Sequence, residues 1–242
     1  MKNSFFFFLF YLCFSSACTH QGKYIKDKIN LDIPDSSDLA YKFHNARVNE
    51  LNLPNLELGI DSFELRLWKY YEPYNINEII VIRKDSKKKW WEGYYYRYWD
   101  IDIISELEVQ RGNKFFEDEI SKNSPEVYTL IDSLNIKKEN PKSGWDIFLN
   151  EIKKEKIYEL PNQKKIPNYK HSTFDGLIWE IEIGTSDSYK YYSYENPQVY
   201  AEKFWQCKQM IKIAEIFERE FPLRPPIDIE ALIEKNKEKK DK

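Results

Sequence analysis

The stretch from residue 177 to residue 221 constrains the fold more than any other part of this chain. Residues 177–183 alternate between apolar and acidic side chains, which is the period of a strand with one buried face. The apolar positions are Leu177, Trp179, Ile181 and Ile183, and Glu180 and Glu182 stand between them. Residues 184–187 read Gly-Thr-Ser-Asp, a turn sequence, and residues 189–194 follow as a second strand. A connection this short predicts an antiparallel hairpin.

Asn196-Pro197 then predicts the start of a long helix, since proline is favoured at the first helical position. Apolar residues recur behind it at steps of three or four, as on one face of a helix. The expected buried stripe is Tyr200, Phe204, Cys207, Ile211, Ala214, Phe217 and Phe221. We therefore expect one helix that packs on the preceding hairpin.

Earlier segments show the same two periods. Strands are expected at residues 63–67, 78–84 and 90–99, with turn residues between the last two. Ser124-Pro125 predicts a helix start, followed by Val127, Leu130, Ile131 and Leu134 at helical spacing. A second short helix is expected at 145–152. Strands outnumber helical crossovers, so the sequence predicts an α+β fold: an antiparallel β-sheet with helices packed on one face and a long C-terminal helix.

The first eighteen residues have the layout of an export signal. Lys2 is followed by ten apolar residues at 5–14, then by Ser15-Ser16-Ala17 and Cys18. Ten helical residues rise only about 15 Å, about half of a bilayer core, so the run is too short to span a membrane. The pattern predicts a signal peptide, residues 1–17, that is removed on export.

Small residues directly before Cys18 resemble the lipobox of bacterial lipoproteins, although that pattern has Leu where Ser15 stands. The resemblance covers eighteen residues. It implies that Cys18 is lipidated (diacylglycerol or palmitate) and that the chain is membrane-anchored in the cell envelope. An aspartate directly after the lipidated cysteine would resemble an inner-membrane retention signal, but this position is Thr19. The resemblance therefore favours the outer membrane. It does not distinguish the periplasmic face of that membrane from the cell surface. An ordinary cut after Ala17 is the alternative.

Length and composition limit the domain organisation and the classes of partner. After residues 1–17, 225 residues remain, with 36 basic and 40 acidic side chains, net −4, which argues against nucleic-acid binding. We expect a tether and N-terminal segment at 18–58 and a globular domain at 59–226, either undivided or made of two sub-blocks, 59–140 and 141–226. A charged tail is expected at 227–242. Cys207 has no obvious partner in the exported chain, so a core rather than disulfides must stabilise it.

The search for catalytic motifs gives little. No glycine-rich loop or nucleophile elbow is present, and His20, His44 and His171 are isolated in sequence, so no cofactor or metal is expected. Glu180 and Glu182 lie about 6.5–7 Å apart on one strand face, a spacing that would suit a glycosidase carboxylate pair. A solvated sheet face is the simpler interpretation of these alternating glutamates.

The strand expected at 90–99 is unusually aromatic, with rings on both faces. Alternate residues of a strand point to opposite faces. The even-numbered positions place Trp90, Tyr94, Tyr96 and Tyr98 on one face, and the odd-numbered positions place Trp91, Tyr95 and Trp99, with Arg97, on the other. Helices on one face of a two-layer fold would leave the other face open, with its rings available to a protein or glycan partner. The alternative is that these rings pack across strands and only stabilise the sheet.

Nothing in the sequence identifies an activity. The first hypothesis is a lipid-anchored, non-enzymatic binding domain that uses the aromatic sheet face, with an immunity or inhibitor lipoprotein as one form of it. The second is an envelope hydrolase of glycan or peptidoglycan that acts through Glu180 or Glu182. A structural lipoprotein without a small ligand is the third.

Overall fold

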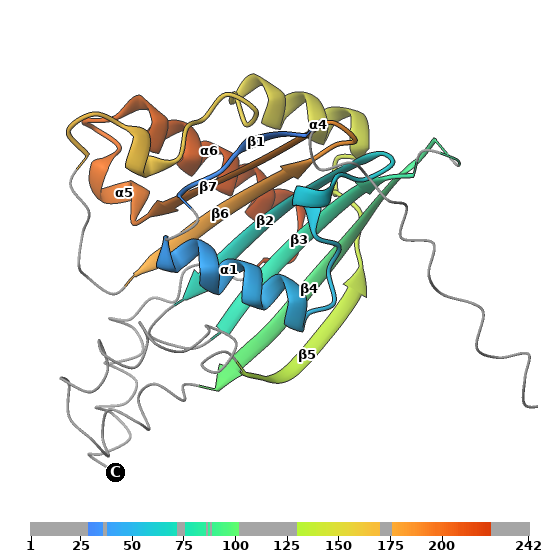
Figure 1. Cartoon of the computed structure of the whole chain (residues 1–242). Coiled ribbons are helices and arrows are strands. Elements are labelled where there is room, and N and C mark those ends of the chain that lie inside the picture. Colours follow the sequence, from blue (N-terminus) through green and yellow to red (C-terminus); the bar gives the residue numbers. More distant parts are fainter. Residues whose placement is uncertain are drawn as a thin grey trace, which may run out of the picture.

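A computed structural model describes residues 29–35, 38–71, 76–85, 87, 89–101, 130–169 and 176–223. It shows one seven-stranded sheet in the order β1-β7-β6-β2-β3-β4-β5, with β2 in the centre (Figure 1). The strands are β1 Asn30–Asp32, β2 Phe63–Tyr71, β3 Ile76–Lys84, β4 Trp91–Ile101, β5 Leu130–Lys138, β6 Leu177–Gly184 and β7 Ser188–Glu195. The helices are α1 Leu39–Glu50, α4 Trp145–Lys154, α5 Pro197–Tyr200 and α6 Trp205–Glu220, with 3₁₀ turns η2 Leu56–Leu58 and η5 Gln163–Lys165.

The sheet confirms the predicted α+β class. Every strand pair is antiparallel except β1 with β7, which is parallel. The strands expected at 63–67, 78–84, 90–99, 177–183 and 189–194 correspond to β2, β3, β4, β6 and β7. Period-2 patterns with short turns between them are thus realised as hairpins.

The helices α4, α5 and α6 lie on one face of the sheet and bury its largest apolar core (Figure 1). Leu67, Ile80 and Ile181 of three adjacent strands are fully buried there, against Phe148 of α4 and Phe217 of α6. The predicted helix at 145–152 is confirmed as α4. Because apolar area removed from water stabilises by about 25 cal/mol per Å², this core is the main source of stability.

Helix α1 covers the opposite face, over the central strands (Figure 1). Val48 and Leu51 are buried against Trp68 of β2 and Ile79 of β3. The segment 18–58, expected as a tether and N-terminal segment, thus contributes β1 and α1 to the fold. The signal peptide at 1–17, Cys18 and the tail at 227–242 lie outside the described residues.

The helix predicted from Ser124-Pro125 onward is wrong in its described part. Residues 130–138 form the edge strand β5, which pairs with β4 from Tyr94 to Ile101. Residues 124–129 lie outside the described residues. Leu130, Ile131 and Leu134 do stand at helical spacing, but pairing with β4 decides the conformation. Long-range pairing therefore overrides local periodicity here.

The long helix predicted from Pro197 is interrupted. Helix α5 ends at Tyr200, and Phe204 has an extended backbone (φ −124°, ψ 118°) at the start of α6. Tyr169 packs against both rings, with centroid distances of 4.8 Å to Tyr200 and 5.3 Å to Phe204. This aromatic contact from a distant loop coincides with the break.

Candidate functional site

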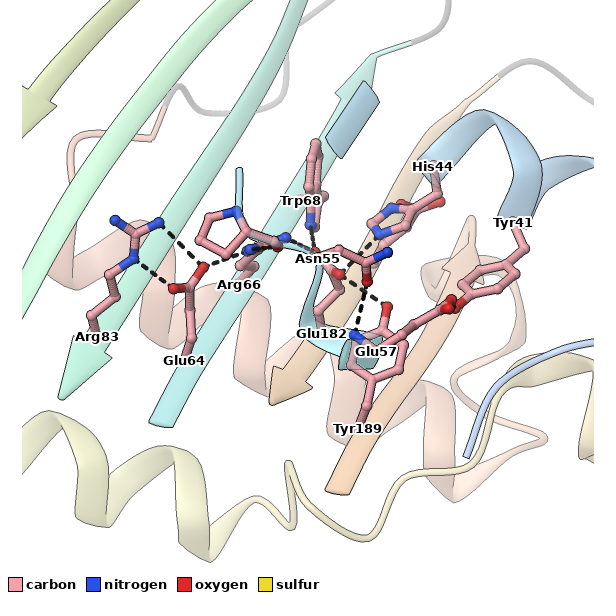
Figure 2. A network of polar contacts seen from close by, with 12 residues as sticks. Tyr41, His44, Asn55, Glu57, Glu64, Arg66, Trp68, Arg83, Glu182 and Tyr189 are labelled. Carbon is pink, nitrogen blue, oxygen red and sulfur yellow. Dashed lines mark hydrogen bonds and ion pairs between the residues drawn. The ribbon is translucent and has the colours of Figure 1, made fainter. Parts of the chain in front are cut away.

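The most elaborate polar cluster lies on the sheet face that α1 covers, where His44 contacts Glu180 and Glu182 of β6; Figure 2 shows His44 beside Glu182. The Nδ1 atom of His44 lies 2.7 Å from Oε2 of Glu180, and its Nε2 atom lies 3.2 Å from Oε1 of Glu182. His44 is fully buried, and Glu180 and Glu182 are 4% and 2% exposed. Its ring packs on Trp68 and Tyr191, with centroid distances of 4.8 Å and 4.6 Å.

The strands explain how the carboxylates meet. Glu180 and Glu182 are two residues apart on β6, so both project from the face that α1 covers. On the neighbouring strand β2, Trp68 pairs with Glu180 and Arg66 pairs with Glu182. Trp68 donates its indole N–H to Oε2 of Glu182 at 2.8 Å, and Nη1 of Arg66 donates to the same oxygen at 3.1 Å.

The cluster continues along the sheet as a chain of alternating charges (Figure 2). Arg66 donates to Glu64 at 2.6 Å, and Glu64 in turn accepts from Arg83 at 2.5 Å. Another Arg66 nitrogen donates to the carbonyl of Pro54 at 2.5 Å. Arg66 is fully buried and Glu64 is 3% exposed. Every charge in the chain therefore has an opposite charge beside it, which is the condition for burying ions without a large penalty.

Two more hydroxyl groups complete the cluster near the start of α1. Tyr189 of β7 donates to Oε1 of Glu182 at 2.9 Å, and Tyr41 of α1 donates to Glu57. Burial and the neighbouring carboxylate raise the pKa of both phenols, so both stay protonated and act as donors. The network thus ties η2, α1, β2, β6 and β7 together.

The surrounding charges decide the protonation state of the centre. Burial lowers the pKa of His44, but the charges of Glu182 and Glu180, and the hydrogen bonds to them, outweigh it and raise that pKa to about 9. Burial raises the pKa of Glu182, yet the charges of Arg66 and His44 lower it well below its usual range. At neutral pH, the cluster therefore holds an imidazolium between carboxylates.

This geometry corrects the expectation that Glu180 and Glu182 lie on a solvated sheet face. Helix α1 covers that face, and its His44 occupies the space between the two carboxylates. Glu182 stays ionised, whereas a glycosidase acid needs a raised pKa and access to its substrate. The arrangement suits a clamp that fixes α1 on the sheet better than it suits an acid–base pair.

The odd-numbered and even-numbered aromatic residues of β4 face opposite sides of the sheet, one covered by α4 and the other by α1. Trp91 and Tyr95 lie on the α4 side, where Trp91 stacks on Trp145 at 6.1 Å. Tyr95 is 6% exposed and donates to Glu78 at 2.5 Å. Of the same parity, Trp99 is half-buried, and the guanidinium of Arg97 lies 4.8 Å from its ring centroid. These rings are largely packing residues.

The other parity faces the α1 side. Tyr96 and Tyr98 are 7% and 0% exposed and belong to the core beneath α1. Tyr94 is half-buried, with Lys138 at 6.0 Å and Arg83 at 5.7 Å from its ring centroid. The aromatic face is thus mostly covered rather than open.

An open apolar surface does remain on the α1 side, beyond the helix, on the edge strand β5. Leu134 and Ile136 are 44% and 51% exposed and lie opposite Tyr98 and Tyr96 of β4. We call Leu134 and Ile136, with Tyr94, Tyr96 and Tyr98 beside them, the β5 patch. Two exposed aliphatic side chains on one strand face form a surface that another molecule can cover.

A shallow groove of about 310 Å³ runs between α4 and α6, lined by Glu151, Lys154, Glu155, Lys212, Glu215, Ile216 and Arg219. Four of its six charged side chains form ion pairs: Lys212 lies 3.3 Å from Glu155, and Arg219 pairs with Glu151. These two pairs reduce the charge that the groove presents to a ligand.

The sequence pattern indicates Glu180 and Glu182 as candidate residues but does not indicate the side chains that bind their carboxylates. His44 is isolated in the sequence, and Glu64 and Arg66 alternate with the apolar residues of the strand expected at 63–67, a pattern that by itself indicates only a polar strand face. One signal was present, since Glu64-x-Arg66 and Glu180-x-Glu182 are charged pairs on one parity of two strands. Only the pairing of β2 with β6 shows that the pairs are complementary.

Comparison with known proteins returned no match to a family model, a curated protein or a solved structure. Among the described residues, no group of three or more His, Cys, Asp or Glu side chains is arranged to hold a metal ion. None of the helices in the described ranges has the length and apolarity needed to cross a membrane.

Proposed function

We propose that the chain is a lipid-anchored cell-envelope protein, attached through Cys18 and placed in the outer membrane, whose domain binds a partner protein without catalysis. The anchor rests on the lipobox-like sequence. The binding role rests on one observation, the exposure of Leu134 and Ile136 on the open half of the sheet face. The carboxylates that would serve a hydrolase are instead sealed beneath α1.

The chemistry of the β5 patch favours a protein over a glycan. Sugar recognition needs flat rings with open faces, but Tyr96 and Tyr98 are buried, and two cations lie over Tyr94. The exposed groups are aliphatic and lie on a strand at the sheet edge. A strand edge offers a partner main-chain hydrogen bonds as well as side-chain contacts.

A matched pair of double variants tests the binding role. Leu134→Ser with Ile136→Ser removes the exposed side chains of the patch, whereas Asn135→Ser with Lys137→Ser changes the opposite face of the same strand. All four side chains are exposed, so both variants should fold, which circular dichroism checks. We expect crosslinking to an envelope protein to fall about tenfold in the first variant only, as for loss of a small hot spot.

Equal crosslinking by both variants would remove the β5 patch from the proposal. The anchor is tested separately by the mass of the native protein. An acylated N-terminal Cys18 is expected, and a chain that keeps Met1, or has an unmodified thiol at Cys18, contradicts it.

A further inference from the structure

The β3–β4 hairpin ends in a basic tip. The amide of Asp85 donates to the carbonyl of Trp90 at 3.1 Å, and the amide of Lys89 donates to that of Asp85 at 2.8 Å. The side chain of Asp85 also accepts from the amide of Lys87 at 2.8 Å, and Lys89 has a left-handed backbone (φ 59°). These bonds join Asp85 to Lys87, Lys89 and Trp90 across the turn. The tip displays the exposed Lys84, Lys87 and Lys89 and Trp90, which is 52% exposed.

This tip lies at the end of the sheet where the described chain begins. The register pairs Lys84 with Phe63, Glu64 with Gly184, and Asn30 with Ser188. The start of β1, the β6–β7 turn and the β3–β4 hairpin therefore share one end of the sheet, at the upper right of Figure 1. The start of β5 lies at the other end, where Ser133 pairs with Trp99.

The anchor and this geometry together orient the domain. Cys18 precedes Asn30 by twelve residues, which reach at most about 40 Å when fully extended. A lipid at Cys18 therefore keeps the start of β1, at this end of the sheet, within about 40 Å of the bilayer. This step rests on the proposed function, because it requires the lipid anchor.

We propose that the β3–β4 hairpin tip is a second membrane contact, with Lys84, Lys87 and Lys89 against anionic phospholipid headgroups and Trp90 in the interfacial layer. Basic residues and tryptophan are the side chains that suit this boundary. The overall charge of the exported chain is negative, so attraction is local to the tip and sets the orientation.

The acidic groups near the tip weaken the attraction without cancelling it. Asp85 is engaged in the turn, and Glu92 lies 2.9 Å from Lys138. Asp61 and Asp187 lie on neighbouring turns, and Asp187 accepts from Thr185 at 2.8 Å. A tip that faces the bilayer directs the start of β5, and with it Leu134, away from the membrane and toward partners.

Lipid-depth quenching on the native acylated protein tests this contact. A fluorophore is attached at Lys87→Cys, or at Ser133→Cys as the far-end control, and Cys207 is fully buried. The protein is reconstituted in phosphatidylcholine vesicles, with or without phosphatidylglycerol, that carry a headgroup-level nitroxide lipid. We expect quenching at position 87 in the anionic vesicles and none at position 133.

Charge reversal supplies the second arm. Each lysine near an anionic surface strengthens association about fivefold, so Lys84→Glu with Lys89→Glu should shift the contact equilibrium by at least about 25-fold and abolish quenching at position 87. Equal signals at positions 87 and 133, or equal quenching with and without phosphatidylglycerol, would overturn the contact while an acylated mass leaves the anchor intact. An unacylated mass would instead overturn the proposed function itself.

Discussion

Replacing His44 with glutamine tests whether the buried charge network holds α1 on the sheet. The variant keeps a polar side chain of similar reach but removes the positive charge between Glu180 and Glu182. Glu182 retains Arg66, Trp68 and Tyr189, so Glu180, 2.7 Å from Nδ1 of His44, loses the most. Breaking a buried ion pair by removing one partner costs about 3–5 kcal/mol.

Proton linkage gives a similar magnitude independently. The pKa of His44 rises from 6.5 in the unfolded chain to about 9 in the fold, and each pKa unit corresponds to about 1.4 kcal/mol, so the protonated form contributes about 3 kcal/mol. Because the folded pKa is the higher one, this contribution is complete below pH 6.5. It is lost as the pH rises through about 9.

Urea unfolding of the purified protein, followed by tryptophan fluorescence between pH 6 and pH 9, measures both effects. At an m-value of about 3 kcal/mol/M, His44→Gln should lower the midpoint by about 1 M at pH 6, and the gap to the wild type should narrow toward pH 9. Lys42→Gln, at an exposed position of the same helix, should change stability by less than about 0.5 kcal/mol. Parallel pH profiles for wild type and His44→Gln would refute the imidazolium assignment.

Two further predictions concern the other face of the sheet. Gly93→Ala should lower the free energy of unfolding by about 2 kcal/mol in the same urea assay. The added Cβ would collide with the carbonyl oxygen of Glu139 and would lie 3.0 Å from the ring of Trp145. An unchanged urea midpoint would contradict this packing. Iodoacetamide should alkylate Cys207 only in denaturant, because the residue is fully buried and burial raises the pKa of its thiol. Peptide mass mapping measures the labelling. Rapid labelling of the native protein would mean that α6 opens readily.

The parts of the fold that local patterns encode could be predicted. Residues 177–195 form a strand, a turn and a strand within nineteen positions, so the period of the side chains and the turn residues suffice to describe the hairpin. The same holds for β3 and β4. Helix α4 was predictable too, because its apolar residues Phe148 and Ile152 face an apolar sheet.

Strand β5 could not be predicted in this way. Its apolar residues Leu134 and Ile136 stand two apart, as in a strand, while Leu130 and Leu134 stand four apart, as in a helix. Both periods fit a nine-residue segment, and the choice depends on β4, whose register shifts between Trp99 and Asp100 where β5 begins to pair. Information that lies in a distant strand is not present in the local pattern.

The candidate site could not be predicted because an alternating pattern does not show whether the polar face of a strand is exposed to water. Period-2 patterns identify the more apolar face of a strand, but they do not show that the other face is wet. The central strand β2 carries Glu64 and Arg66 on the same sheet face, where Arg66 contacts Pro54 in the segment after α1, and both are at most 3% exposed. Helix α1 meets this polar face with a mixed stripe, in which Tyr41, His44 and Val48 are buried at helical spacing and His44 supplies the charge. A helix that covers charges must supply charge or hydrogen bonds, so polar residues interrupt the apolar stripe by which such helices are recognised.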